Sequence, residues 1–159
     1  MDFQTPSEVC DYMVSLMKSD NLKNHLKILE PTPGEGNLVN ALRRLTFNEV
    51  IAPDDFWNID ETEYFDYIIM NPPFSPMEMG YKILYRCMNM SNRIIALMPW
   101  LTIINSEKRT KDIMNFGLRS ITHLPRNVFK GSRVQCCVLE MEKDFREETK
   151  FKTFNFKNE

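Results

Sequence analysis

The chain has 159 residues, of which 43% are hydrophobic and 26% are charged, and its formal net charge is −2 at pH 7. This length suffices for one domain with a sizeable core. The charge excludes an overall basic field for nucleic acid and leaves local basic patches open. No apolar run approaches the roughly 20 residues of a membrane helix. The four cysteines lack the spacing of a metal site or a disulfide framework. We therefore expect a cytoplasmic protein without a metal ion or a membrane partner.

Hydrophobic periodicity predicts strands that alternate with helices along most of the chain. Residues 5–18 form the first predicted helix, in which Thr5 caps the amino terminus and Glu8 completes a capping box. The elements that follow are strand 26–30, helix 37–45, strand 49–52, strand 65–70, helix 76–90, strand 93–99, helix 106–117, strand 120–124 and strand 134–142.

This alternation indicates an α/β fold with a mostly parallel sheet covered on both faces, and the last two strands predict an antiparallel hairpin. Residues 1–143 account for all of these elements. Residues 144–159 alternate phenylalanines with charged residues and form either an interaction arm, as a C-terminal tail, or an edge strand.

The first predicted strand ends in Glu30, and Gly34 and Gly36 follow before the next helix. In open parallel sheets, ligands bind beyond the carboxyl ends of the strands, where glycines let the backbone approach and a helix offers free N–H groups. The loop lacks the spacing of a dinucleotide or phosphate loop. By itself it fits a simple turn equally well.

The strand at 65–70 runs directly into Asn71, Pro72, Pro73 and Phe74. Neither proline nitrogen carries a proton, so the loop presents acceptors and an aromatic ring. The Asn71 side-chain oxygen and the Pro72 carbonyl can each take one hydrogen of an exocyclic NH2 group, while Phe74 stacks on its ring. Holding both hydrogens frees the nitrogen lone pair for attack on a methyl sulfonium, and dipoles aimed in advance stabilise the developing positive charge. The loop therefore predicts a site for methylation of an aromatic amine, with a proline-rich turn as the alternative.

These segments together resemble the S-adenosylmethionine (SAM)-dependent N6-adenine DNA methyltransferases of bacterial and phage restriction–modification systems. The similarity covers about residues 3 to 143, and the tetrapeptide 71–74 is its most specific feature. The resemblance implies a Rossmann-like SAM-dependent methyltransferase fold with catalytic Asn71, Pro72, Pro73 and Phe74.

The resemblance also implies a role for residues that composition and spacing leave unassigned. The cofactor positions are Thr5, Glu30, Thr32, Gly34, Gly36, Asp55 and Phe56. Among them, Thr5 contacts the methionine end of SAM, Asp55 accepts from its adenine amino group and Phe56 stacks on that adenine. The substrate positions are Phe129 and the surrounding cations Arg126, Lys130 and Arg133. A target adenine flipped out of the DNA would lie between Phe74 and Phe129.

Two departures from the family pattern leave alternatives open. Only 18 residues separate Gly36 from Asp55, which is room for one helix and one strand and leaves no ribose-binding strand. Glu35 is a candidate to replace the missing carboxylate, although its spacing does not indicate this role. The family usually continues into a target-recognition domain, so this minimal, phage-like form would act with a separate recognition subunit or as a homo-oligomer in a bacterial or phage-infected cell. The alternatives are a degenerate, inactive binding protein, serving as a partner or decoy for nucleic-acid enzymes, and a methyltransferase for RNA adenine or protein glutamine.

Overall fold

The computed structural model describes residues 5–17, 25–45, 49–73, 75–129 and 134–155. Phe74, which is predicted to be catalytic, and Lys130 and Arg133, which are predicted to bind the substrate, lie outside the described residues.

Helices and strands alternate along the chain as the hydrophobic pattern predicts. They are α1 (Ser7–Ser15), β1 (Lys27–Leu29), α2 (Asn37–Leu45), β2 (Glu49–Ile51), the 3-10 helix η2 (Phe56–Asn58), β3 (Tyr67–Met70), α3 (Met77–Met88), β4 (Arg93–Pro99), α4 (Leu101–Ile104), α5 (Glu107–Phe116), β5 (Leu118–His123), the 3-10 helix η3 (Arg126–Val128), β6 (Cys136–Glu142) and β7 (Lys150–Thr153). None of the described helices has the length and apolarity that crossing a bilayer requires.

The strands form one sheet in the order β2-β1-β3-β4-β6-β5-β7. β2, β1, β3 and β4 run parallel, whereas β6 is antiparallel to both β4 and β5. The α/β fold with an antiparallel C-terminal hairpin is therefore confirmed. β7 pairs in parallel with β5 at the edge of the sheet, so Lys150–Thr153 is an edge strand.

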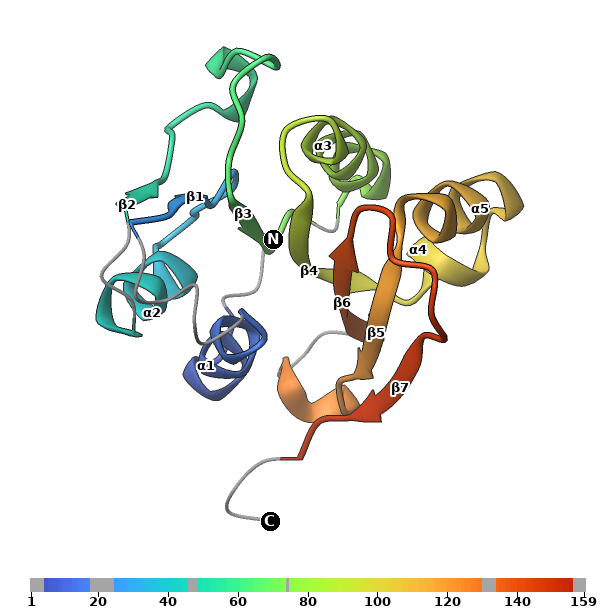
Figure 1. Cartoon of the computed structure of the whole chain (residues 1–159). Coiled ribbons are helices and arrows are strands. Elements are labelled where there is room, and N and C mark those ends of the chain that lie inside the picture. The colour runs from blue at the N-terminus through green and yellow to red at the C-terminus, as the bar shows by residue number, and fades with distance from the viewer. Residues whose placement is uncertain (1–4, 18–24, 46–48, 74, 130–133, 156–159) are drawn as a thin grey trace.

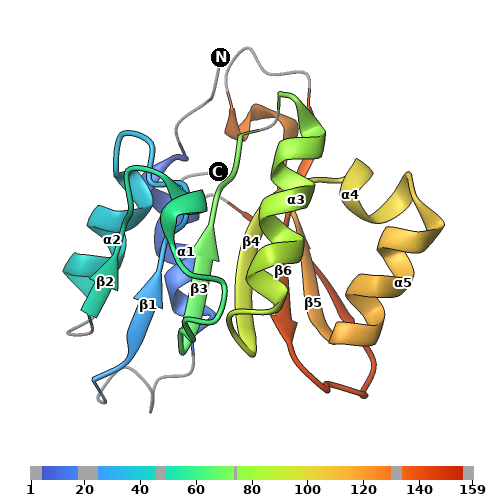
Figure 2. The same ribbon diagram turned by 90° about the horizontal axis from the view of Figure 1, so that it is seen from above.

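Helices cover both faces of the sheet, with α1 and α2 on one face and α3, α4 and α5 on the other (Figures 1 and 2). This explains why every residue of β3 is buried, since a strand covered on both sides reads as a continuous apolar run. Cys136 packs in the core on the α1 side and Cys137 in the core on the α3 side, and both thiols are free.

The predicted capping box of α1 is wrong. The helix begins at Ser7, and Pro6 occupies the cap position without a side-chain cap hydrogen bond. The backbone carbonyl of Pro6 instead accepts from the N–H groups of Val9 and Cys10. The hydroxyl of Thr5 is consequently available for another partner.

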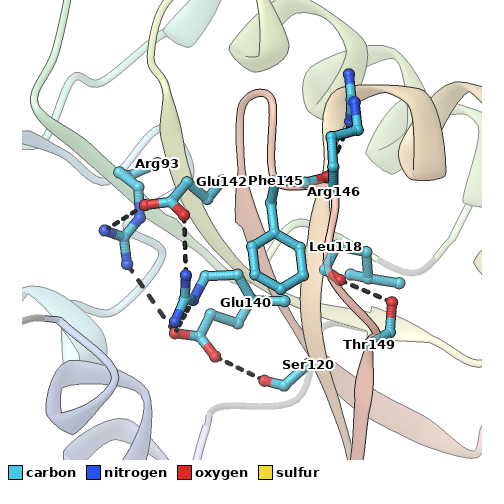
Figure 3. Close-up of polar contacts among 9 residues, drawn as sticks. Arg93, Leu118, Ser120, Glu140, Glu142, Phe145, Arg146 and Thr149 are labelled. Carbon is cyan, nitrogen blue, oxygen red and sulfur yellow. Dashed lines mark hydrogen bonds and ion pairs between the residues drawn. The ribbon is translucent and has the colours of Figure 1, made fainter.

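A cluster of ion pairs lies at the end of the sheet where β4 begins and β6 ends (Figure 3). Arg93 lies 3.1 Å from Glu142 and 4.0 Å from Glu140, and Arg119 lies 2.9 Å from Glu142. The hydroxyl of Ser120 donates to Glu140 at 2.7 Å. Two cations and two anions balance in this partly buried cluster, which satisfies charges that would otherwise be costly to bury.

Gly117 ends α5 with a φ of +133°, and a Cβ atom built there would lie 2.0 Å from the carbonyl oxygen of Glu142. We expect Gly117→Ala to lower the free energy of unfolding by about 3 kcal/mol or more, because the backbone of β6 must move. Urea denaturation measures this change.

Gly36→Ala is the matched control. Gly36 also has a positive φ, +93°, but its Cβ would meet only the side-chain amide of Asn40 at 3.9 Å. We expect a cost of about 1–2 kcal/mol from the backbone conformation alone. Equal losses in the two variants would contradict a steric role for Gly117.

Candidate active site

A pocket of about 420 Å³ lies where the parallel strands β1, β2 and β3 end. The lining consists of three loops, one after each strand, the start of the chain's described part, two residues of α2 and two residues of α3. The lining residues are Thr5, Glu30, Pro31, Thr32, Pro33, Gly34, Asn37, Leu38, Pro53, Asp54, Asp55, Phe56, Trp57, Asn71, Pro72, Pro73, Met79 and Ile83. The pocket therefore has the position at which open parallel sheets bind ligands.

The loop after β1 buries a carboxyl group at the pocket. Glu30 is 1% exposed, and the backbone N–H of Thr32 donates to its Oε1 atom at 2.7 Å. Burial raises the pKa of Glu30 to about 8, although the hydrogen bonds from Thr32 oppose this rise. Near neutral pH the folded chain therefore carries Glu30 largely as the neutral acid.

The loop after β2 forms a second wall through Asp55, Phe56 and Trp57. Asp55 caps η2 by accepting from the backbone N–H of Trp57 at 3.0 Å. The Phe56 ring is buried, while Trp57 is 42% exposed. The guanidinium of Arg86 on α3 lies 5.3 Å from the centre of each ring and donates to the carbonyl of Ile59. Cation–π contacts thus hold this wall against α3.

The loop after β3 presents the predicted acceptors. Asn71 donates from its Nδ2 atom to the hydroxyl oxygen of Thr5, and among the described residues nothing donates to Asn71 Oδ1. Thr5 is 2% exposed, and its backbone carbonyl accepts from Nδ2 of Asn37 at 3.1 Å. The amide of Asn71 is therefore held by its nitrogen, which leaves its oxygen to accept.

The two prolines of this loop rest on Gly80 of α3. A Cβ atom on Gly80 would lie 3.2 Å from the Pro73 carbonyl oxygen and 3.5 Å from Cγ of Pro72. Only glycine permits this close approach without displacing Pro72 and Pro73. Gly80 therefore fixes the distance between the loop and α3, which we call the loop height.

Most of the predicted site residues line this pocket. They are Thr5, Glu30, Thr32, Gly34, Asp55, Phe56, Asn71, Pro72 and Pro73. Gly36 lies in the turn before α2 and is not part of the lining.

Of the predicted substrate residues, the structure describes Phe129 and Arg126, and it places both outside the pocket lining. Phe129 is 5% exposed and packs in the core on the α1 side, while Arg126 is exposed in η3. Neither lines the pocket. Within the described part of the chain, Asn71, Pro72 and Pro73 are thus the predicted catalytic or substrate residues that meet the cofactor positions.

Sequence reasoning missed Asn37, Asp54 and Trp57, which also line the pocket. Asp54 could have been found, because it follows a predicted strand and the carboxyl ends of parallel strands share one edge. Glu35, which the sequence suggested as a ribose ligand, is exposed and is not part of the lining.

Comparison with solved structures identifies the architecture. The chain superposes on the methyltransferase subunit of a type I restriction–modification system from Streptococcus thermophilus with a TM-score of 0.74 and 15% identity, over 96% of this chain and 47% of that one. It superposes on a Listeria monocytogenes protein, provisionally identified as a class I SAM-dependent methyltransferase, with a TM-score of 0.72 and 15% identity, over 95% and 65%. A modification subunit of a provisionally identified type I restriction enzyme from Vibrio vulnificus gives 0.71 and 15%, over 98% and 47%.

The chain has the fold of the class I SAM-dependent methyltransferases. It spans 65% of the Listeria protein and about half of the two subunits. No protein-family model and no curated protein sequence matches it.

The buried carboxyl of Glu30 makes stability depend on pH. Its pKa is about 8 in the folded chain against an ordinary 4.5, so between these values the folded chain holds a proton that the unfolded chain releases. Stability due to this group therefore falls as pH rises from about 4.5 to about 8, by up to about 1.4 kcal/mol per pH unit.

We expect Glu30→Gln, which mimics the neutral acid, to remove this dependence. The free energy of unfolding of the variant minus that of the wild type, measured by urea denaturation from pH 5 to pH 8.5, should grow with pH and level off near pH 8. A difference that stays constant over this range would show that Glu30 titrates normally.

Proposed function

We propose that this chain transfers a methyl group from SAM to the exocyclic N6 amine of adenine in DNA. The observation that carries the proposal is that one pocket joins the glycine loop after β1 to the acceptors Asn71 and Pro72 after β3. The pocket belongs to a fold that SAM-dependent methyltransferases share. We call the acceptors Asn71 Oδ1 and the Pro72 carbonyl the amine clamp. Because the cofactor site and the amine clamp share one cavity, the methyl group can pass directly from the cofactor to the amine.

The donor set of the pocket fits SAM. Glu30 is buried, and no cation of the described residues pairs with it, so it favours a cationic ligand whose charge would stabilise the ionised form. Gly34 permits a close approach of the ligand to the backbone. When bound, SAM supplies an electrophilic methyl group on a sulfonium. We assign the methionine end to Thr5 and Glu30 and the adenine to Asp55 and Phe56.

We assign the ribose to Asp54. The carboxyl end of β2, the strand that pairs directly with β1, carries this exposed carboxylate into the pocket lining. A carboxylate can accept from both hydroxyls of a ribose. Asp54 could therefore replace the carboxylate of the missing ribose-binding strand. That missing strand is one of the two departures from the family pattern that leave an inactive binding protein open.

On the substrate side, Asn71 Oδ1 and the Pro72 carbonyl take the two hydrogens of the amine. Among the described residues, neither oxygen accepts another hydrogen bond. The amine proton can leave to solvent after attack, when the nitrogen is cationic, so no strong base is needed. We place Phe74 and Phe129 on the target base as in the resembling family, which for Phe129 requires the ring to leave the core.

DNA is the proposed substrate, since the Streptococcus and Vibrio structures are described as subunits of type I restriction–modification systems. This chain spans about half of each. We therefore expect a separate recognition subunit or a second copy to supply the grip on DNA, which a chain of net charge −2 lacks.

Calorimetry with SAM, followed by transfer of labelled methyl groups to unmethylated DNA, RNA and protein, tests the proposal. We expect SAM binding, transfer to adenine in DNA, and a loss of about 10²–10³ in kcat for Asn71→Ala with SAM affinity unchanged within about threefold. Asn92→Ala is the control, because Asn92 is exposed and directly precedes the start of β4, at the end of the strand away from the pocket. This variant should keep wild-type rates.

Each failure has a distinct meaning. Absence of binding at millimolar SAM would refute the enzyme. Transfer only to RNA, or only to protein glutamine, would show that the substrate is not DNA. Binding of SAM without methyl transfer to DNA, RNA or protein would favour the inactive binding protein.

Gly80 offers an independent test of the amine clamp. We expect Gly80→Val to lower kcat at least about tenfold by displacing Pro72 and Pro73, and Gly80→Ala to lower it less. SAM affinity should stay within about threefold. The change in the free energy of unfolding for Gly80→Ala should be small, because the preference of alanine over glycine in a helix, up to about 1 kcal/mol, offsets the cost of the close contact with the Pro73 carbonyl. Full activity in both variants would mean that the loop height is unimportant.

A further inference from the structure

We propose that Thr5 is a positioning residue that sets which end of the Asn71 amide faces the substrate amine. This inference rests on the proposed function and adds a role to a residue otherwise assigned to the cofactor. The structure brings Thr5 and Asn71, 66 positions apart in the chain, into a hydrogen bond at the pocket wall.

The orientation of the amide matters because its two ends have opposite hydrogen-bonding properties. The oxygen accepts, while the nitrogen only donates. If the Asn71 amide turned by 180° about its last bond, it would point N–H groups at the N–H groups of the amine. The clamp would then repel its substrate.

Thr5 fixes the productive orientation. Its hydroxyl oxygen accepts from Nδ2 of Asn71, which turns Oδ1 away from Thr5. Thr5 is 2% exposed and the Asn71 side chain is partly buried at the pocket wall, so the end of the amide that faces Thr5 takes its hydrogen bond from this hydroxyl. The hydroxyl of Thr5 accepts from Nδ2, but a free hydroxyl proton could equally be donated to Oδ1 of a turned amide. Thr5 therefore selects the productive orientation when its proton is donated to another acceptor, such as a ligand carboxylate in the cofactor pocket, because a turned Oδ1 would then face only the lone pairs of the hydroxyl.

The position of Thr5 is itself held by α2, the helix that follows the glycine loop, and by α1. Asn37, the first residue of α2, donates from Nδ2 to the Thr5 carbonyl at 3.1 Å, and Cys10 of α1 donates from its thiol to the same carbonyl at 3.6 Å. The hydroxyl is free for Asn71 because Thr5 does not cap α1. Two hydrogen bonds, from Asn37 to Thr5 and from Asn71 to Thr5, thus link the start of α2 to the amine clamp.

The hydroxyl can serve both sides at once. Accepting from Asn71 leaves the hydroxyl proton of Thr5 free, and Asn71 is its hydrogen-bond partner within the described residues. Donation of that proton to a ligand carboxylate would polarise the hydroxyl and strengthen its acceptor side. Occupation of the cofactor pocket would therefore tighten the hold on Asn71.

Three variants separate positioning from cofactor contact and from packing. Thr5→Val keeps the shape and removes the acceptor, while Thr5→Ser keeps the acceptor. Thr102→Val is the matched control, because Thr102 is fully buried and its hydroxyl has no hydrogen-bond partner in the described part of the chain. Each is compared with the wild type in methyl transfer at saturating SAM and in SAM affinity.

We expect Thr5→Val to lower kcat by about tenfold to a hundredfold, Thr5→Ser to stay within about threefold, and Thr102→Val to match the wild type. Because Thr5 acts through Asn71, Thr5→Val combined with Asn71→Ala should be no slower than Asn71→Ala alone. Multiplying effects in the double variant, or a loss of SAM affinity without a loss of kcat, would overturn the positioning role.

A second readout needs no activity and keeps the two proposals apart. The side-chain NH2 signals of Asn71 in a ¹⁵N–¹H correlation spectrum can be assigned by their absence in Asn71→Ala. We expect them to be shifted from the values of exposed asparagines in the wild type and in Thr5→Ser, and to move to those values in Thr5→Val. Identical Asn71 signals in wild type and Thr5→Val would overturn the inference, even if methyl transfer is confirmed. The expected shifts in a chain that transfers no methyl group would uphold it while the proposed function fails.

Discussion

The parallel pairing of β1 with β2 on one side and β3 on the other is the constraint on which this site depends. Parallel strands end at the same edge, so the three loops that follow them meet although 41 positions separate Glu30 from Asn71. Hydrophobic burial on both faces fixes the strands, and the loops inherit their positions. The site is thus a product of sheet topology, since each loop alone is an ordinary turn.

Two polar groups at the ends of these strands have constrained protonation or orientation. Glu30 is buried as a largely neutral acid near pH 7, and the Asn71 amide is tied by its nitrogen to Thr5. The burial of Glu30 lowers the stability that the sheet core provides, because taking a carboxyl group out of water costs free energy. Both groups prepare the pocket for a ligand with a positive charge on one side and N–H donors on the other.

The sequence predicted the strands well because they are apolar runs between clear breakers, and the mostly parallel direction of the sheet followed from their alternation with helices. The resemblance of several ordered segments also pointed to residues of all three loops that line the pocket. The sequence prediction failed where tertiary contacts override local patterns: the capping signal of Thr5 and Glu8 loses to the hydrogen bond with Asn71. It also could not show that Phe129 packs in the core, since an aromatic residue in a turn suits either a ligand or a core. The four-residue α4 is too short to leave a periodic signal.

The wall formed by η2 has an optical consequence. The chain contains two tryptophans, and they lie in different surroundings. Trp57 lines the pocket beneath the guanidinium of Arg86, whereas Trp100 donates from its indole nitrogen to His123 at 2.9 Å and stacks on Phe151. Indole emission responds to nearby charge and to the loss of water. The fluorescence of Trp57 is therefore an intrinsic reporter of pocket occupancy, with Trp100 as a constant background outside the pocket lining.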